Sequence, residues 1–191
     1  MRLVLSRRPP GPKECAWWLG KPASSPPEGF PTGMYDRHES SVHCRRDESA
    51  DAAFERIREQ LFAYDIFPAT LMHFAFCPGN RIELHGLIVQ RAGIGPIRLE
   101  SAVRVVDVWD TETVDGRDAG FRYVTLAGHP ERGVASFAVR RDSSGGVHVI
   151  LDARSQPGTL IARLGRPVAR RVQVAATRAA VKRLAGRAGL R

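Results

Sequence analysis

Hydrophobic and polar positions alternate with a period of two over much of the chain after residue 70. In the run 97–109, for example, Ile97, Leu99 and Val103 alternate with charged residues. This pattern is typical of a strand with one buried and one wetter face. Short turns rich in glycine, proline and serine separate six such runs. The predicted strands are 71–76, 82–91, 97–109, 120–126, 134–141 and 146–154.

Two segments have the period of an α-helix instead. In 51–64, the residues Phe54, Ile57 and Leu61 fall on one face. The second predicted helix covers 167–186, where Pro167 suits a first helical position and Gly186 a stop.

The order of these elements predicts an α+β fold. A first strand is expected at 41–46, followed by the helix, the six strands and the long C-terminal helix. Short connections favour antiparallel neighbours. We therefore expect a curved antiparallel sheet of about seven strands wrapped on a long C-terminal helix, with one sheet face and the helix burying a shared core.

The first 38 residues differ from the rest of the chain, because they hold seven of its 13 prolines. Such a composition predicts irregular or extended chain rather than helix. Trp17 and Trp18 argue against disorder, so at least one indole is expected to be buried. We predict an N-terminal arm over 1–38, packed on a single domain over 39–191.

Composition narrows the class of protein. The chain has 191 residues, of which 43% are apolar, which suits one domain with a sizeable core. No apolar run is long enough for a membrane span, and the apolar stretch near the N-terminus is too short for a secretory signal. The three cysteines (Cys15, Cys44 and Cys77) are scattered, which favours reduced thiols and a cytoplasmic protein.

The net charge of +9 is concentrated near the C-terminus. From Arg163 onward the sequence has basic residues and no acidic one. Arg171, Arg178 and Lys182 group on one side of the predicted helix. This side is either a solvated helix face or a surface for nucleic acid or another anionic partner.

Two stretches resemble a known family. They are "GFRYVTLAGHPERGVASFAV" and "LDARSQPGTLIARLGRPVARRVQ". The first is similar to the pattern F-x-Y-G-T-L-x-G-H-P-x-x-G-E-x-x-F-x-V of the domain-of-unknown-function nineteen-ninety family. That resemblance implies a START-like, helix-grip fold and no particular activity. Three residues depart from the family pattern: Val124 stands in place of glycine, Val134 in place of glutamate and Gln156 in place of arginine.

A helix-grip fold implies a ligand cavity between sheet and helix. Aromatic residues on alternating strand positions can line it, and a few polar groups can anchor a ligand. We expect a small hydrophobic molecule (a lipid, polyketide or aromatic metabolite) as the partner. The candidate ligand-binding residues are Phe121, Tyr123, Thr125, His129, Phe137 and Arg154.

Other functions remain open at this point. His129, between Gly128 and Pro130, is either a turn residue or the acid/base of a cyclase or hydrolase acting in the same cavity. No other catalytic residue is predicted. The spacing of His38, His43 and Cys44 does not match a zinc site, and neither a metal nor a cofactor is predicted.

Overall fold

The computed structural model describes residues 2–5, 8–26, 34–93, 97–158 and 178–186. Its helices and strands follow one another in the order β1 (Arg2–Leu5), α1 (Pro12–Leu19), β2 (Met34–Ser41), α2 (Ala50–Phe62), β3 (Met72–Cys77), β4 (Leu87–Ala92), β5 (Ile97–Thr113), β6 (Gly116–Thr125), β7 (Glu131–Asp142) and β8 (Val147–Pro157).

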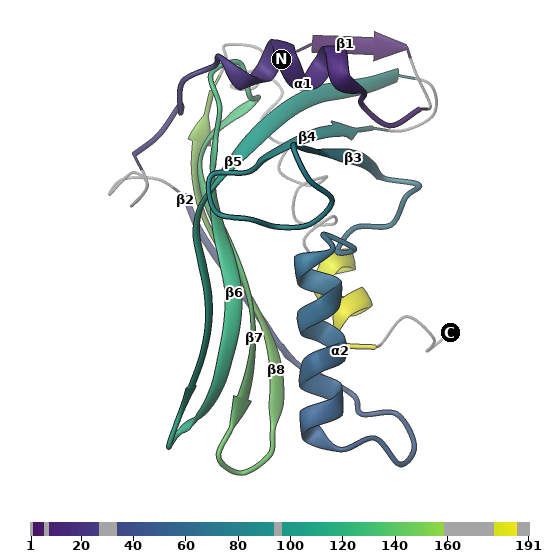
Figure 1. The fold of residues 1–191 in the computed structure, drawn as a ribbon, viewed down its shortest axis with the longest axis vertical. Helices are drawn as coiled ribbons and strands as arrows, with labels where there is room; N and C mark the ends of the chain where they lie inside the picture. The colour runs from purple at the N-terminus through teal and green to yellow at the C-terminus, as the bar shows by residue number, and fades with distance from the viewer. Residues whose placement is uncertain (1, 6–7, 27–33, 94–96, 159–177, 187–191) are drawn as a thin grey trace.

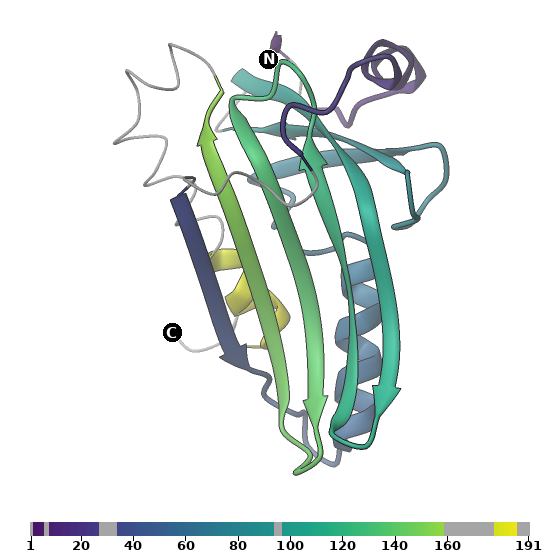
Figure 2. The same cartoon turned by 90° about the vertical axis from the view of Figure 1, so that its left-hand side faces the viewer.

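The strands form one curved antiparallel sheet in the order β2-β8-β7-β6-β5-β4-β3, with β1 added to the start of β5. β5 to β8 are long, and at one end the sheet bends toward the side on which α2 lies, while α1 lies on the outer side of the bend (Figures 1 and 2). The α+β class and the antiparallel order are confirmed. The sheet has eight described strands rather than about seven, because β1 also joins it.

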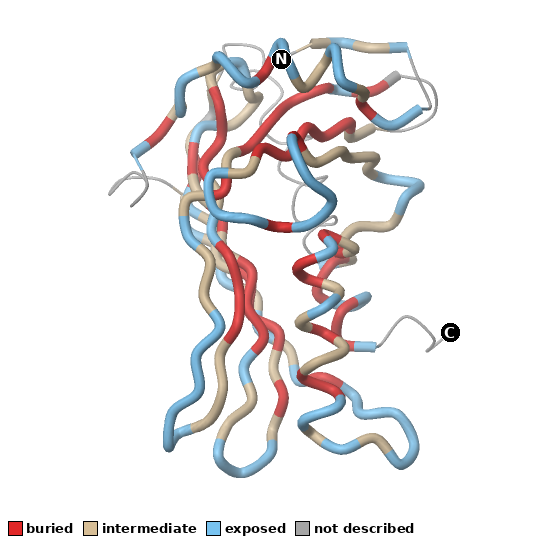
Figure 3. The backbone as a smooth tube through the Cα atoms, viewed as in Figure 1, coloured by how far each residue is buried: buried red, intermediate tan, exposed pale blue. Residues whose placement is uncertain are grey.

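The concave face of the sheet carries the main hydrophobic core, and α2 packs on it against β6, β7 and β8. The predicted helix is confirmed, since Phe54, Ile57 and Leu61 are buried in this core. Buried and more exposed stretches alternate along α2 (Figure 3). Ser49 caps this helix by accepting a hydrogen bond from the Ala52 N–H over 3.1 Å.

The C-terminal helix is described only over residues 178–184, where Ala180, Val181 and Leu184 are buried in the same core. Residues 167–177 of the predicted helix lie outside the described residues. The long described helix facing the sheet is therefore α2, and the sheet makes up more of the described structure than we expected.

The prediction of no helix in the arm was wrong. Pro12 occupies the first turn of α1, where proline needs no N–H partner. The Glu14 carboxylate accepts the Gly11 N–H over 2.9 Å and so caps the helix start. Trp18 in α1 is fully buried, while Trp17 is 43% exposed.

The first long strand also differs from the prediction, since β2 covers Met34–Ser41 rather than 41–46. This strand lies at the edge of the sheet, where none of its residues is fully buried. An edge strand needs few apolar residues, so its sequence does not show the apolar alternation by which the other strands were predicted. β4 begins at Leu87 rather than at residue 82, after a turn in which His85 has φ +66°. β5 continues to Thr113 and β6 already begins at Gly116, so these two strands extend into a polar hairpin, and β7 and β8 are also longer than predicted.

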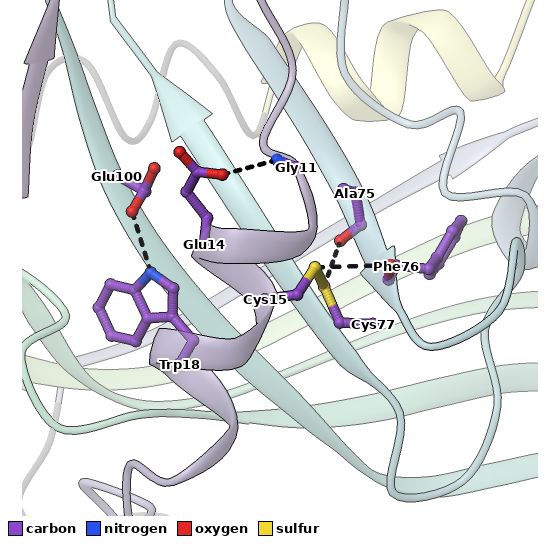
Figure 4. Close-up of a disulfide and its surroundings, with 8 residues drawn as sticks. All are labelled: Gly11, Glu14, Cys15, Trp18, Ala75, Phe76, Cys77 and Glu100. Atoms are coloured by element: carbon purple, nitrogen blue, oxygen red, sulfur yellow. Dashed lines mark hydrogen bonds between the residues drawn. A yellow bond between two sulfur atoms is a disulfide. The ribbon is translucent and has the colours of Figure 1, made fainter.

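The convex face has a smaller core of its own, which α1 covers. Trp18 packs there with Leu87, Val89 and Leu126, and Cys15 is joined to Cys77 of β3 by a disulfide (Figure 4). The prediction of reduced thiols is wrong for this pair, because the arm brings two cysteines 62 residues apart to a Cα separation of 5.6 Å. Cys44 is free and exposed. The prediction of a cytoplasmic protein relied partly on three reduced thiols, and that argument no longer holds because two of them form a disulfide.

None of the helices in the described residues combines the length and the apolar content that crossing a bilayer requires.

Candidate functional site

Aromatic rings gather on the concave face where β6 and β7 lie side by side. Phe121 and Phe137 are cross-strand partners, and their rings stack with centroids 5.3 Å apart and planes 14° apart. The Tyr123 ring lies 5.7 Å from that of Phe137. The structure thus brings together three of the predicted ligand-binding residues, as their alternation along the strands requires.

Residues that follow α2 and residues of β3 extend this aromatic surface. The Tyr64 ring lies 5.1 Å from that of Phe74, which in turn lies 5.5 Å from that of Phe76. The ring centroid of Phe67 lies 6.3 Å from that of Phe137. Tyr64 is buried, whereas the three phenylalanines of this extension are only partly buried although they pack on the core.

A polar network crosses the aromatic surface. The Gln90 amide of β4 donates a hydrogen bond to the Tyr64 hydroxyl over 2.7 Å. The hydroxyls of Tyr64 and Tyr123 lie close enough for each to influence the pKa of the other. Burial raises the pKa of both tyrosines above the ordinary value, so both hydroxyls stay protonated at neutral pH.

Sequence reasoning missed Tyr64 and Gln90 as parts of the site. Tyr64 continues the apolar stripe of the first predicted helix and therefore looked like a core residue. In the structure α2 ends at Phe62, and Tyr64 has φ +55°, a left-handed conformation that is unusual for a bulky side chain. The helix end turns the Tyr64 ring toward β3 and Gln90. The sequence did offer one signal for this site: Gln90 is a polar residue at a strand position that is buried.

Thr125 lies farther along β6 and its hydroxyl is already used within the protein. Its Oγ1 accepts the Gly133 N–H over 2.9 Å and lies 2.6 Å from the Ser24 hydroxyl. The Ser24 N–H also donates to the Thr125 carbonyl. Thr125 therefore fastens the arm to the β6–β7 connection and has no free group for a ligand.

His129 sits in the turn between β6 and β7, apart from the aromatic surface. Its Nδ1 accepts the Glu131 N–H over 3.0 Å. Burial lowers the pKa of His129 to about 4, so the ring is neutral at pH 7. Nδ1 also lies 2.8 Å from the Glu131 carbonyl oxygen, so the backbone engages this nitrogen in either tautomer of the ring. This geometry favours a structural corner.

Arg154 is not brought to the aromatic cluster. Its neighbour Ala153 packs on the concave core, and successive strand residues point to opposite faces. Arg154 is exposed on the convex face, where its guanidinium lies 5.2 Å from the ring centroid of Tyr35. It therefore cannot anchor a molecule held on the concave face.

An open groove runs between the edge strand β2 and the described part of the C-terminal helix. Its lining comprises His38, Glu39, Ser40, Arg178, Val181 and Lys182. Arg178 and Lys182 share this groove with the acidic side chain of Glu39. The groove is therefore not the uniformly basic kind of surface that attracts nucleic acid. Arg171 of the predicted basic face lies outside the described residues.

Within the described ranges, His, Cys, Asp and Glu side chains do not come together in any group of three or more that could hold a metal ion.

Comparison with known proteins assigns the chain to a family. Residues 21–183 match the model of the family described as Domain of unknown function (DUF1990). The chain belongs to this family. The match includes the whole concave aromatic surface and begins after α1, so the DUF1990 model does not contain Cys15 or Trp18. None of the curated proteins is similar in sequence to this chain.

Solved structures with a similar fold have low sequence identity. A norcoclaurine synthase point mutant from Thalictrum, in complex with a transition-state analogue, is 11% identical over 80% of this chain and 94% of its own, with a TM-score of 0.47. A hypothetical protein from Helicobacter pylori is 9% identical over 91% and 94%, with a TM-score of 0.47. Major latex-like protein 151 from Panax ginseng is 11% identical over 76% and 93%, with a TM-score of 0.40.

Two of the three departures from the DUF1990 pattern are neighbours in space. Val124 and Val134 are cross-strand partners on β6 and β7, and Val124 is buried. Val134 also pairs with Arg154 of β8. Both valines point to the convex face, because the alternate residues Tyr123 and Ala135 pack on the concave core. These departures leave the aromatic surface unchanged.

Proposed function

We propose that the protein binds a small hydrophobic molecule against the concave face of the sheet. The observation that carries this proposal is the aromatic surface itself, in which Phe67, Phe74, Phe76 and Tyr123 pack on the core while remaining partly accessible. Ligand sites are typically apolar and aromatic with a small number of polar groups. The hydrogen-bonded Gln90–Tyr64 pair and the Tyr123 hydroxyl supply such groups.

Apolar burial drives such binding. Each square ångström of apolar surface removed from water contributes about 25 cal/mol. The rings are fixed against one another by stacking and edge contacts, so little side-chain freedom is lost when a ligand arrives. The hydroxyls add orientation, because a buried polar group favours a ligand atom that can pair with it.

No observation favours an enzyme with His129 as acid or base, since that ring is neutral, bonded to the backbone and remote from the aromatic surface.

The first test is native mass spectrometry of gently purified protein. A discrete mass excess that disappears on denaturation identifies a bound molecule directly. The second is titration with the neutral fluorescent probe N-phenyl-1-naphthylamine, whose emission rises in apolar surroundings. We expect saturable binding.

The blocking variant is Ala153→Phe, because Ala153 is partly accessible on the concave face and a ring there occupies the ligand's space. Ser136→Phe adds the same ring to the convex side of β7 and is the matched control. We expect at least a tenfold loss of affinity in the first variant and little change in the second. Equal affinities in all three proteins would contradict the proposal.

A further inference from the structure

The edge strand β2 has one open side. Among the described strands it pairs with β8 alone, and Figure 2 shows it at the outer edge of the sheet. Its register is unbroken over eight residues and it contains no proline. Free edges are commonly protected by a bulge, a proline or a very short strand, because open N–H and C=O groups attract another strand. β2 has none of these three protections, whereas the opposite edge strand, β3, is shorter and is linked to α1.

The direction of the β2 hydrogen bonds shows which backbone groups are open. The Val42 N–H donates to the Val147 carbonyl over 2.7 Å, so the even-numbered residues of β2 direct their backbone groups to β8. The odd-numbered residues therefore direct theirs away from the sheet. Within the described ranges, these outward N–H and C=O groups have no backbone partner. They belong to Tyr35, Arg37, Glu39 and Ser41.

The open stretch has a defined end. The next outward N–H, that of His43, donates to the Ala185 carbonyl over 3.0 Å. The C-terminal helix thus satisfies the edge beyond β2 but leaves the strand itself open. On the concave side, His38, Glu39 and Ser40 line the groove toward this helix, so the side chains of an added strand have space there.

The sequence of β2 is complementary to a second copy of itself. When two copies run antiparallel with His38 opposite His38, Arg37 faces Glu39 and Tyr35 faces Ser41. All outward residues then meet in hydrogen-bonded pairs, which gives roughly eight backbone hydrogen bonds. A shift by two residues would bring Arg37 opposite itself or Glu39 opposite itself, and like charges directly opposite each other are destabilising. A shift by one residue would pair outward with inward backbone groups.

Arg37 is already part of a charged row on the convex face. It is the cross-strand partner of Asp152 on β8, and their side chains lie 3.1 Å apart. Its guanidinium also pairs with Glu39 of the same strand over 3.0 Å. In the register above, the row continues from Asp152 through Arg37 to Glu39 of the second copy. Each guanidinium then has a carboxylate on both neighbouring strands.

We infer that β2 is a homodimer interface, at which β2 of a second copy of this chain adds antiparallel to the free edge and joins two sheets into one. A second copy fits better than an unrelated strand, because the register that pairs every outward backbone group is also the register that matches the charges. The aromatic surface lies on other strands of the sheet, so this inference is independent of the proposed function.

Charge reversal tests the pairing. Sedimentation velocity of the full chain over a range of concentrations should show a reversible monomer–dimer equilibrium. Arg37→Glu and Glu39→Arg each place like charges opposite each other at both symmetry-related positions. Each variant alone should therefore dimerise at least about tenfold more weakly. An equimolar mixture of the two should form the dimer again, because every cross-strand pair then has opposite charges.

The matched control is Arg122→Glu, which makes the same charge change at an exposed convex position of β6. Its dimerisation should equal that of the wild type. All three substitutions alter exposed side chains, so near-ultraviolet circular dichroism should show that each variant is folded.

Engineered cysteines test the register in a Cys44→Ala background, which removes the exposed free thiol. His38→Cys places two thiols at a non-hydrogen-bonded pair with Cα atoms about 4.5 Å apart, a separation that a disulfide can span. Ser40→Cys is the control on the same side of β2, because its two copies lie four residues apart along the strands, roughly 14 Å. On oxidation, only His38→Cys should give a covalent dimer on a non-reducing gel.

Three results would overturn the inference. One is a wild type that remains monomeric at every concentration. Another is a dimer that both charge variants leave unchanged, or that their mixture does not restore. The third is equal cross-linking at His38→Cys and Ser40→Cys, because it would mean that the contact does not have this register.

Discussion

The two faces of the sheet hold different kinds of buried polar group. On the convex face, the fully buried Glu100 carboxylate pairs with Arg91 at 2.8 Å and accepts the Trp18 N–H and an Arg2 guanidinium N–H. Arg91 in turn reaches Glu14 and two backbone carbonyls of the arm. On the concave face, the buried Ser155 hydroxyl has no hydrogen-bond partner among the described residues.

This difference indicates what each face is for. A buried charge is stable only when it is paired and hydrogen-bonded, and the convex network satisfies its carboxylate from three directions. That face holds the arm in place. The concave face instead leaves the buried Ser155 hydroxyl unpaired, which costs about 1–3 kcal/mol.

The largest expected effect comes from breaking the convex network. Glu100→Ala leaves the buried Arg91 guanidinium without its main partner, which typically costs about 3–5 kcal/mol in the free energy of unfolding. Urea unfolding measures it. Asp65→Ala removes an exposed partner of Arg183 and should change little. Equal, small losses in both variants would show that the convex network is solvated.

The disulfide gives the next effect. Cys15→Ala combined with Cys77→Ala removes a link across 62 residues, which should lower the free energy of unfolding by about 2–4 kcal/mol. Because α1 lies on the convex face, affinity for N-phenyl-1-naphthylamine should stay within twofold of the wild type. Cys44→Ala is the control for cysteine removal. A large loss of probe affinity in the double variant would show that the two faces are coupled.

His129 predicts a pH dependence. Its folded pKa of about 4 lies below the ordinary value of 6.5, so between these pH values the unfolded chain binds a proton that the folded one does not. Stability therefore rises with pH across this window and falls on acidification, by at most roughly 3 kcal/mol at 1.36 kcal/mol per unit.

His129→Asn separates this effect from other titrations, because the amide oxygen can still accept the Glu131 N–H but does not titrate. Urea unfolding at pH 7 and pH 4.5 should show a smaller acid loss in the variant. An identical loss in both proteins would place the titration at another group. Glu48 is not that group, because its pKa falls from 4.5 to about 2 on folding and its contribution is therefore lost below pH 4.5.

The contrast between the faces also marks how far sequence reasoning reached. Alternation predicted β5 to β8 and placed Phe121, Tyr123 and Phe137 on one face, because a period of two is a local property of the chain. It could not reveal that Thr125 is already bonded to Ser24, since that contact joins residues 101 positions apart. The Cys15–Cys77 pair was missed for the same reason. The outward position of Arg154 was available from alternation, because Leu151 and Ala153 of the same strand pack on the concave core.

α1 and β2 failed differently. Proline content suggested an irregular arm, but Pro12 stands at the one helical position that tolerates it. β2 is a polar edge strand whose place is set by its pairing with β8 rather than by its own pattern.

The smallest expected effect concerns Val134, the convex-face residue that stands where the family pattern has glutamate. Val134→Glu restores the residue type of the family pattern directly opposite Arg154. Opposite charges at such a cross-strand position contribute roughly 0.2–1 kcal/mol, and Val134 is partly exposed, so the carboxylate remains hydrated. We expect a slight stabilisation that disappears when Arg154 is also changed to Ala.

A double-mutant cycle on urea unfolding isolates this coupling from the loss of the Tyr35 contact. Because both side chains lie on the convex face, probe binding should be the same in all four proteins. A coupling energy of zero would mean that Arg154 stays on Tyr35 and that the family's glutamate serves another partner.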